Sequence, residues 1–142
     1  MRIDFKVARN PKAQKRHRHT TTGKFVRTYD PSAPDKKEFL ELCMYFAPEE
    51  PIDGAVWLYL KFIFERPLSH YGTGKNSAIL KESAPDFHAS KPDIDNLGKF
   101  VMDALNGIFF KDDAQVLYFE ASKRYVESKD DLPRTEITIH SL

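Results

Sequence analysis

Four aspartates and one lysine stand close together in the sequence and could do chemistry as a group. Asp93 and Asp95 are two residues apart, Lys99 follows, and Asp112 and Asp113 are adjacent. Two carboxylates that converge to about 4 Å repel each other by roughly 4 kcal/mol at an effective dielectric near 20. A convergence of these acids therefore predicts a bound cation.

The residue types in this group indicate which cation it would hold. Hard oxygen ligands without His or Cys favour Mg²⁺, with Mn²⁺ as the alternative ion. A calcium EF-hand is excluded, although Asp93, Asp95 and Gly98 match its first, third and sixth loop positions. Leu97 occupies the fifth position, and Ala104 replaces the glutamate of the twelfth.

A helix must position these side chains. Apolar residues with a helical period predict an amphipathic helix from about Asp95 to Asn106: Leu97, Phe100, Val101, Ala104, Leu105 and Ile108. Asp93 and Asp95 at its start could instead cap free N–H groups, and Lys99 could form an ordinary ion pair with Asp95. The turn from Gly107 to Lys111 decides whether Asp113 reaches Asp93.

The remaining pattern predicts an α+β fold, a single domain over residues 1–142. Alternation predicts a first strand at Ile3–Val7 and a long central strand at Val56–Phe64, and Ser32 begins a capped helix. Two last strands, near 117–125 and 135–139, are expected to form a hairpin through the turn ESKDDLP. We expect one mixed sheet of about four strands with two main helices.

Residues 10–30 form a predicted basic loop. Residues 1–30 carry a net charge of +7, which leaves −6 for the rest of the chain. No acid lies between Pro11 and Arg27. A basic run of this kind favours an arm that follows nucleic acid phosphates, and its candidate contacts are Lys15, Arg16, Arg18, Lys24 and Arg27.

A second, long flexible loop is predicted at residues 66–92, where a loop of this length is usually functional or disordered. Its GTGKN segment lacks the first Gly and the Ser/Thr of a Walker loop, which excludes a nucleotide cofactor bound through that motif. Lys75 in this loop is a candidate DNA contact.

The lone cysteine, Cys43, is expected to be a buried thiol. No signal peptide and no apolar run long enough to cross a bilayer is found, so no membrane association is expected. A reducing, cytoplasmic setting fits these features.

The combined run DIDNLGKFVMDALNG…KDDAQV resembles the signature of the RusA family of Holliday junction resolvases. The resemblance implies a RusA-like, Mg²⁺-dependent endonuclease that acts as a homodimer on four-way junction DNA and resolves it by paired symmetric cuts. It also implies that Asp93, Asp95 and Asp113 are the essential carboxylates and Lys99 the essential lysine. Asp112 and Asn96 would flank or support the site, with Asp112 as a further candidate metal ligand.

The longer loop at 66–92 is similar to that of family members associated with bacteriophages. Two other functions stay open. One is a nuclease for other branched DNA or for RNA. The other is a non-catalytic junction- or duplex-binding protein whose acids only cap a helix.

Overall fold

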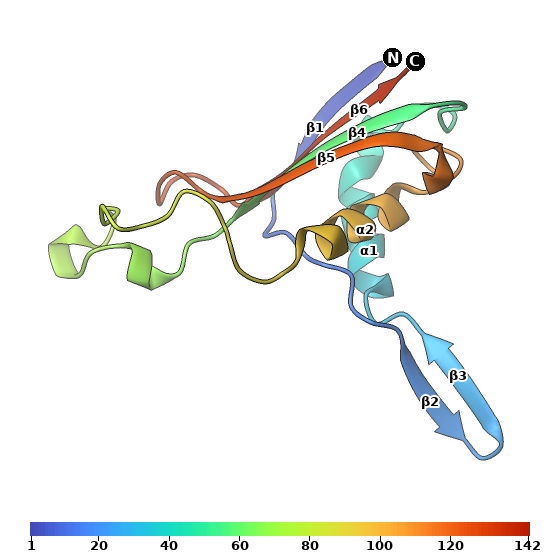
Figure 1. Cartoon of the computed structure of the whole chain (residues 1–142), viewed down its shortest axis with the longest axis horizontal. Helices are drawn as coiled ribbons and strands as arrows, with labels where there is room; N and C mark the ends of the chain where they lie inside the picture. The colour runs from blue at the N-terminus through green and yellow to red at the C-terminus, as the bar shows by residue number, and fades with distance from the viewer.

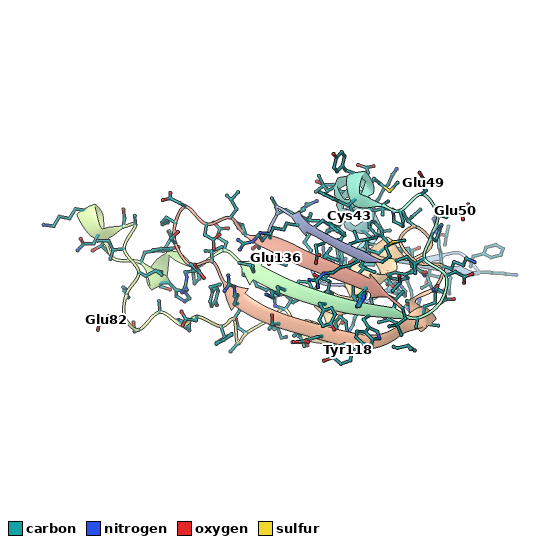
Figure 2. All side chains as sticks on the ribbon, turned by 90° about the horizontal axis from the view of Figure 1, so that it is seen from above. Cys43, Glu49, Glu50, Glu82, Tyr118 and Glu136 are labelled. Carbon is teal, nitrogen blue, oxygen red and sulfur yellow. The ribbon has the colours of Figure 1, made fainter.

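The computed structural model describes all 142 residues and has one main sheet. Its four strands lie in the order β1 (Arg2–Val7), β6 (Arg134–Ser141), β4 (Val56–Phe64) and β5 (Val116–Tyr125), side by side in Figure 2. β6 is antiparallel to both β1 and β4, whereas β5 runs parallel to β4. The predicted α+β fold, with a mixed four-stranded sheet and an interior strand at 56–64, is confirmed.

The hairpin predicted from the last two strands is wrong. β4 lies between β5 and β6, so these two strands are not paired with each other. β4 is the most apolar strand, and an interior position buries it best. The connection at residues 126–133 can span about 26 Å when extended, which is enough to pass the end of one strand.

Two helices cover one face of the sheet (Figure 1): α1 (Ala33–Cys43) and α2 (Ile94–Leu105). α1 packs against α2 and β1, and α2 packs against β5. Alternate residues of β4 supply the centre of the core beneath them. Cys43 is fully buried in this core, and burial raises the pKa of its thiol to about 12. The predicted buried thiol is confirmed.

The basic loop is more regular than its sequence pattern predicted. Residues 18–29 form a separate hairpin of β2 (Arg18–Thr22) and β3 (Phe25–Tyr29), which projects away from the domain in Figure 1. Gly23, with φ of +62°, supplies the left-handed conformation that its tight turn requires. None of the residues in these two strands is buried, so the sequence has no alternation of buried and exposed residues that would predict them.

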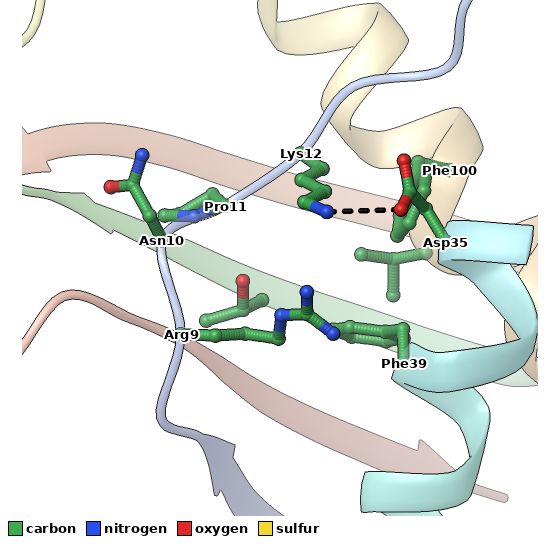
Figure 3. A pocket seen from close by; sticks show the side chains of 9 residues that line it. Arg9, Asn10, Pro11, Lys12, Asp35, Phe39 and Phe100 are labelled. Atoms are coloured by element: carbon green, nitrogen blue, oxygen red, sulfur yellow. Dashed lines mark hydrogen bonds and ion pairs between the residues drawn. The ribbon is translucent and has the colours of Figure 1, made fainter. Parts of the chain in front are cut away.

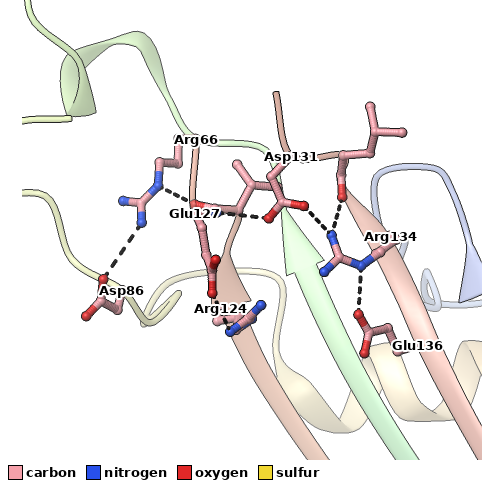
Figure 4. A network of polar contacts seen from close by, with 9 residues as sticks. Arg66, Asp86, Arg124, Glu127, Asp131, Arg134 and Glu136 are labelled. Atoms are coloured by element: carbon pink, nitrogen blue, oxygen red, sulfur yellow. Dashed lines mark hydrogen bonds and ion pairs between the residues drawn. The ribbon is translucent and has the colours of Figure 1, made fainter. Parts of the chain in front are cut away.

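The long loop at 66–92 extends beyond one end of the sheet (Figure 1) and is attached to it by polar contacts. The buried Arg66 donates from Nε to the carbonyl of Val126 (2.6 Å) and from a terminal nitrogen to the carbonyl of Pro85 (2.7 Å), part of the network in Figure 4. Residues 86–88 then follow the outer edge of β5, where the Tyr125 N–H donates to the Asp86 carbonyl (2.9 Å). The loop therefore covers the last residues of that edge.

The other face of the sheet carries no helix. Trp57 and Tyr59 of β4 cluster there with Tyr118 of β5, with ring centroids 6.1 and 5.7 Å from the Tyr118 ring. Figure 2 shows Tyr118 on the outermost strand, on the opposite side of the view from Cys43 on α1. No helix in the structure is both long and apolar enough to cross a membrane.

Candidate active site

The start of α2 presents two carboxylates that have no structural partner. The apolar side of this helix is buried, so its polar side faces outward. Asp93 occupies the N-cap position, but its side chain accepts no capping hydrogen bond. Only its backbone carbonyl is used, by the Leu97 N–H (3.1 Å). Asp95 in the first turn is likewise exposed and in no ion pair. Helix capping therefore does not account for this pair.

Lys99 is the third exposed group on this side of α2. An ion pair with Asp95, four residues earlier, would have been the ordinary role for it. No such pair is formed, and Lys99 contacts no other carboxylate within 4.0 Å. Its ammonium group is free to bind an external anion.

The base of the basic arm lies against the same side of the helix. The Gln14 N–H donates to the Asn96 carbonyl (2.9 Å), which joins the arm to the first turns of α2. An open hollow between arm and helix is lined only by polar side chains: Gln14, Lys15, Arg16, His17, Asn96 and Lys99. Three of these carry a full positive charge and none is acidic, so the hollow suits a phosphate group.

The arm is held in this position by a polar latch around Asp30. Asp30 accepts hydrogen bonds from the side chain of Gln14 (2.8 Å) and the N–H of Ser32 (2.9 Å), and it pairs with Lys36. Burial alone would raise the pKa of Asp30, but these donors hold it at about 2. Ser32 is the N-cap residue of α1, as predicted, but its side chain makes no capping hydrogen bond. Its hydroxyl accepts from the Lys15 N–H instead (2.9 Å), and so fixes the arm.

Further along the arm towards β1, residues 9–12 lie beside side chains of both helices (Figure 3). Lys12 pairs with Asp35 of α1 (2.9 Å), and Arg9 pairs with Glu38 (3.0 Å). A small cavity beneath them is closed by Phe39 and Phe100, one from each helix. The segment that leads into the arm is therefore fastened to α1 by two ion pairs.

Asp112 has a structural role that the sequence did not suggest. Its carboxylate accepts from the Ala114 N–H (2.8 Å), while the Gln115 side chain accepts from the Asp112 N–H (2.7 Å). These bonds cap a 3₁₀ turn, Asp113–Gln115, that leads into β5. Gln115 also donates to the carbonyls of Ile52 and Gly54 (2.9 and 2.7 Å). The DDxQ motif thus fixes the chain on either side of Asp113.

Asp113 lies at the other end of α2 from Asp93 and Asp95. A hydrogen bond with the Asp112 carboxyl raises the pKa of Asp113, and partial burial and the charge of Asp103 act in the same direction. Asp103 lies eight residues after Asp95 on α2, a rise of about 12 Å. No group of three or more Asp, Glu, His or Cys side chains in the protomer is close enough to hold a metal ion. The structure brings together Lys99, Asn96, Lys15 and Arg16, but not the three predicted carboxylates.

The other predicted DNA contacts lie apart from this site. Arg18, Lys24 and Arg27 are on the projecting hairpin and are exposed. Lys75 is exposed in the 3₁₀ turn Gly74–Asn76 of the long loop. Sequence reasoning missed Gln14 and His17, which line the hollow. Their place in an acid-free basic run was the only signal, and it does not show which residues turn toward α2.

Unpaired carboxylates and an unpaired lysine beside a basic arm are typical of enzymes that act on nucleic acid phosphates. The family model for endodeoxyribonuclease RusA matches residues 9–140, and the chain belongs to this family. Members of this family are endodeoxyribonucleases of the Holliday junction resolvase class, and the chain is therefore an endodeoxyribonuclease. The chain is also 34% identical over 145 residues to an uncharacterized protein of Bacillus subtilis strain 168, YqaN, an alignment that covers 99% of this chain and 96% of that protein.

Proposed function

We propose that this protein is a Mg²⁺-dependent endonuclease that resolves four-way DNA junctions as a homodimer. The observation that carries the proposal is the start of α2, where Asp93, Asp95 and Lys99 are exposed, unpaired and adjacent to the hollow at the base of the basic arm. None of the three forms an ion pair within the protomer, so all are free to bind an external ligand. The family match supplies DNA as the ligand.

The donor set at this site fits Mg²⁺ in chemistry. Asp93, Asp95 and Asp113 offer hard carboxylate oxygens, and Mg²⁺ is usually bound in proteins by one or two carboxylates together with water and substrate phosphates. When bound, the ion would lower the pKa of a water nucleophile and offset negative charge on the scissile phosphate. Two of these ligands stand at one end of α2 and the third at the other, so one protomer supplies only part of the set.

A second copy of the chain would supply the missing ligand if the dimer forms along β5. This strand is at the edge of the sheet, and its exposed side chains include Leu117 and Phe119, 69% and 39% exposed. Long exposed apolar edge strands readily pair with another chain. Residues 86–88 cover this edge only near Lys123–Tyr125, which leaves the first part of β5 open.

Antiparallel pairing of two β5 strands reverses one protomer relative to the other. Asp113 precedes β5, and Lys123 near its end donates from Nζ to the carbonyls of Ser90 and Pro92 (2.6 and 2.8 Å), directly before Asp93. In such a dimer the Asp113 end of each protomer would lie beside the Asp93 end of its partner. Two identical sites related by a two-fold axis suit the near two-fold symmetry of a four-way junction.

The roles of the side chains follow from their positions. Asp93 and Asp95, with Asp113, would hold Mg²⁺ and the attacking water. Lys99 would neutralise charge that develops on the phosphate in the transition state, where a fixed cation contributes most. Lys15 and Arg16 in the hollow would hold a neighbouring phosphate, and Asn96 keeps the arm in place through its backbone carbonyl.

Cleavage assays test this function. The protein should cut a synthetic four-way junction in millimolar Mg²⁺ and cut much more slowly a flap, a linear duplex or a hairpin RNA. EDTA should abolish cutting. Asp93→Asn and Asp95→Asn should each reduce cleavage at least 100-fold without loss of folding, whereas Asp53→Asn, a surface acid paired with Lys111, should not. Equal rates on all substrates, or active Asp93→Asn protein, would refute the proposal.

A further inference from the structure

The hairpin formed by β2 and β3 is a two-stranded ribbon that packs on nothing in the protomer. It pairs only with itself, and all ten strand residues are exposed. In Figure 1 it stands clear of both helices. An isolated two-stranded ribbon is marginally stable in water. Its side chains are therefore arranged for a partner, not for a core.

The two faces of the ribbon have different compositions. Directly paired residues of antiparallel strands project to the same face, so the register assigns each side chain. The pairs Arg18–Tyr29, Thr20–Arg27 and Thr22–Phe25 share one face. The pairs His19–Thr28 and Thr21–Val26 share the other. Both arginines and both aromatic rings thus lie on a single face, which we call the Arg/aromatic face (Arg18, Phe25, Arg27 and Tyr29).

On the opposite face, two polar side chains are paired with each other. The Nδ1 of His19 and the hydroxyl of Thr28 lie within hydrogen-bond distance (2.9 Å). The Arg/aromatic face has no hydrogen bond or ion pair of its own, and no acidic residue occurs between Pro11 and Tyr29. Its guanidinium groups are therefore free to bind an external anion.

Phe25 is a large apolar residue of this face that has no packing role within the protomer. Its side chain is 80% exposed and follows the turn at Gly23 and Lys24 directly, at the far end of the ribbon. Beside a nucleic acid, an exposed phenyl ring can stack on a nucleobase or insert into an interrupted base stack. Base stacking is interrupted at the centre of a branched DNA, which is the substrate proposed above.

We propose that the Arg/aromatic face binds junction DNA, with Arg18 and Arg27 on backbone phosphates and Phe25 stacked on a base at the branch point. This inference rests on the proposed function for its ligand. A five-residue strand spans about 17 Å. Phe25 therefore contacts DNA well away from the phosphate held in the hollow beside Lys99, and it acts in recognition of the branch and not in the chemistry of the cut.

Neighbouring residues on opposite faces give matched variants for a test. Phe25→Ala and Val26→Ala remove apolar groups from the two faces, and Arg27→Ala and Thr28→Ala do the same for polar groups. None of these side chains is buried, so the melting temperature should not change. Binding is measured by anisotropy in EDTA, which prevents cleavage, with a four-way junction that carries 2-aminopurine at the branch point.

We expect Phe25→Ala to weaken junction binding about tenfold and to abolish the 2-aminopurine signal that wild-type protein produces, whereas Val26→Ala retains both. Arg27→Ala should reduce the slope of log K against log salt by about 0.9, and Thr28→Ala should leave it unchanged. Equal effects of Phe25→Ala and Val26→Ala, or an equal signal from 2-aminopurine placed within a duplex arm, would overturn the inference.

Cleavage by the wild-type protein separates this inference from the proposed function. Cutting of the junction together with identical Phe25→Ala and Val26→Ala binding defeats only the assignment of the ribbon. A clear difference between these two variants without any cutting in Mg²⁺ supports the ribbon assignment and defeats only the nuclease site.

Discussion

The N–H of Gln14 donates to the carbonyl of Asn96 across 2.9 Å, and this single backbone bond fixes the basic arm beside the helix that carries Lys99. The bond connects two stretches that are 82 residues apart in the sequence. It is made in addition to the side-chain latch at Asp30. Binding of DNA by the arm and cleavage at α2 are therefore expected to be mechanically linked.

Lys99→Ala should separate cleavage from binding. A cation that acts only on the transition state contributes on the order of 100-fold to 1000-fold in rate, while the arm supplies most of the phosphate contacts. We expect single-turnover cleavage of a junction to fall by about that factor and the Kd to change much less. Lys6→Ala on β1, which does not line the hollow, is the control. A weaker Kd together with an unchanged cleavage rate at saturating protein would assign Lys99 to binding alone.

Asp30→Asn should weaken the latch in a pH-dependent way. The pKa of Asp30 is about 2 in the folded protein and close to 3.8 when unperturbed. Because the folded value is the lower one, the ionised group stabilises the fold above about pH 4, and this contribution is lost as the pH falls toward 2. Its size at neutral pH is about 2 kcal/mol at most.

Urea unfolding at several pH values tests that assignment. Asp30→Asn should be less stable than wild type at pH 7, and the difference should shrink between pH 4 and pH 2. Asp53→Asn, whose ion pair with Lys111 is exposed, should show no such trend. A difference that is the same at pH 7 and pH 2 would mean that the charge of Asp30 does not stabilise the arm.

Gly98→Ala should disturb the packing of α2 on β5. A Cβ at Gly98 would lie 2.5 Å from Cζ of Phe119, so the ring must move. Overpacking of this kind costs about 1–3 kcal/mol, against a gain of about 1 kcal/mol in helix propensity. We expect a net loss in urea unfolding that is relieved in the double variant Gly98→Ala, Phe119→Ala. Additive effects of the two changes would contradict this contact.

The sequence predicts the parts of the fold that have a buried face. The alternation in Val56–Phe64 and the helical stripe through Leu97, Phe100 and Val101 arise from burial, and both elements were located correctly. The pairing of β5 was predicted wrongly, because an eight-residue connection permits either a hairpin or a crossing over β4. The ribbon at 18–29 was missed as a whole, although Phe25, Arg27 and Tyr29 alternate with Val26 and Thr28 next to a turn glycine.

The candidate site was predicted in its residue types but not in its geometry. The spacing of the motif identified Asp93, Asp95, Lys99 and Asp113 as candidates. It does not determine the path that the chain takes after α2. That path carries Asp113 away from Asp93, to the side of Asp103. Whether a partner brings the acids together depends on the surface of the folded edge strand, which no local pattern specifies.

Subunit complementation tests the central claim, that each metal site is built from two protomers. Asp93→Asn and Asp113→Asn proteins are each expected to be inactive on a four-way junction in Mg²⁺. When the two are mixed and allowed to exchange subunits, half of the dimers should be mixed, and each mixed dimer has one intact site. The mixture should therefore contain about one quarter as many active sites as wild-type protein. Because each mixed dimer has a single active site, it should produce nicks instead of paired cuts. A mixture that forms mixed dimers yet stays inactive would show that the site lies within one chain, and would contradict the account.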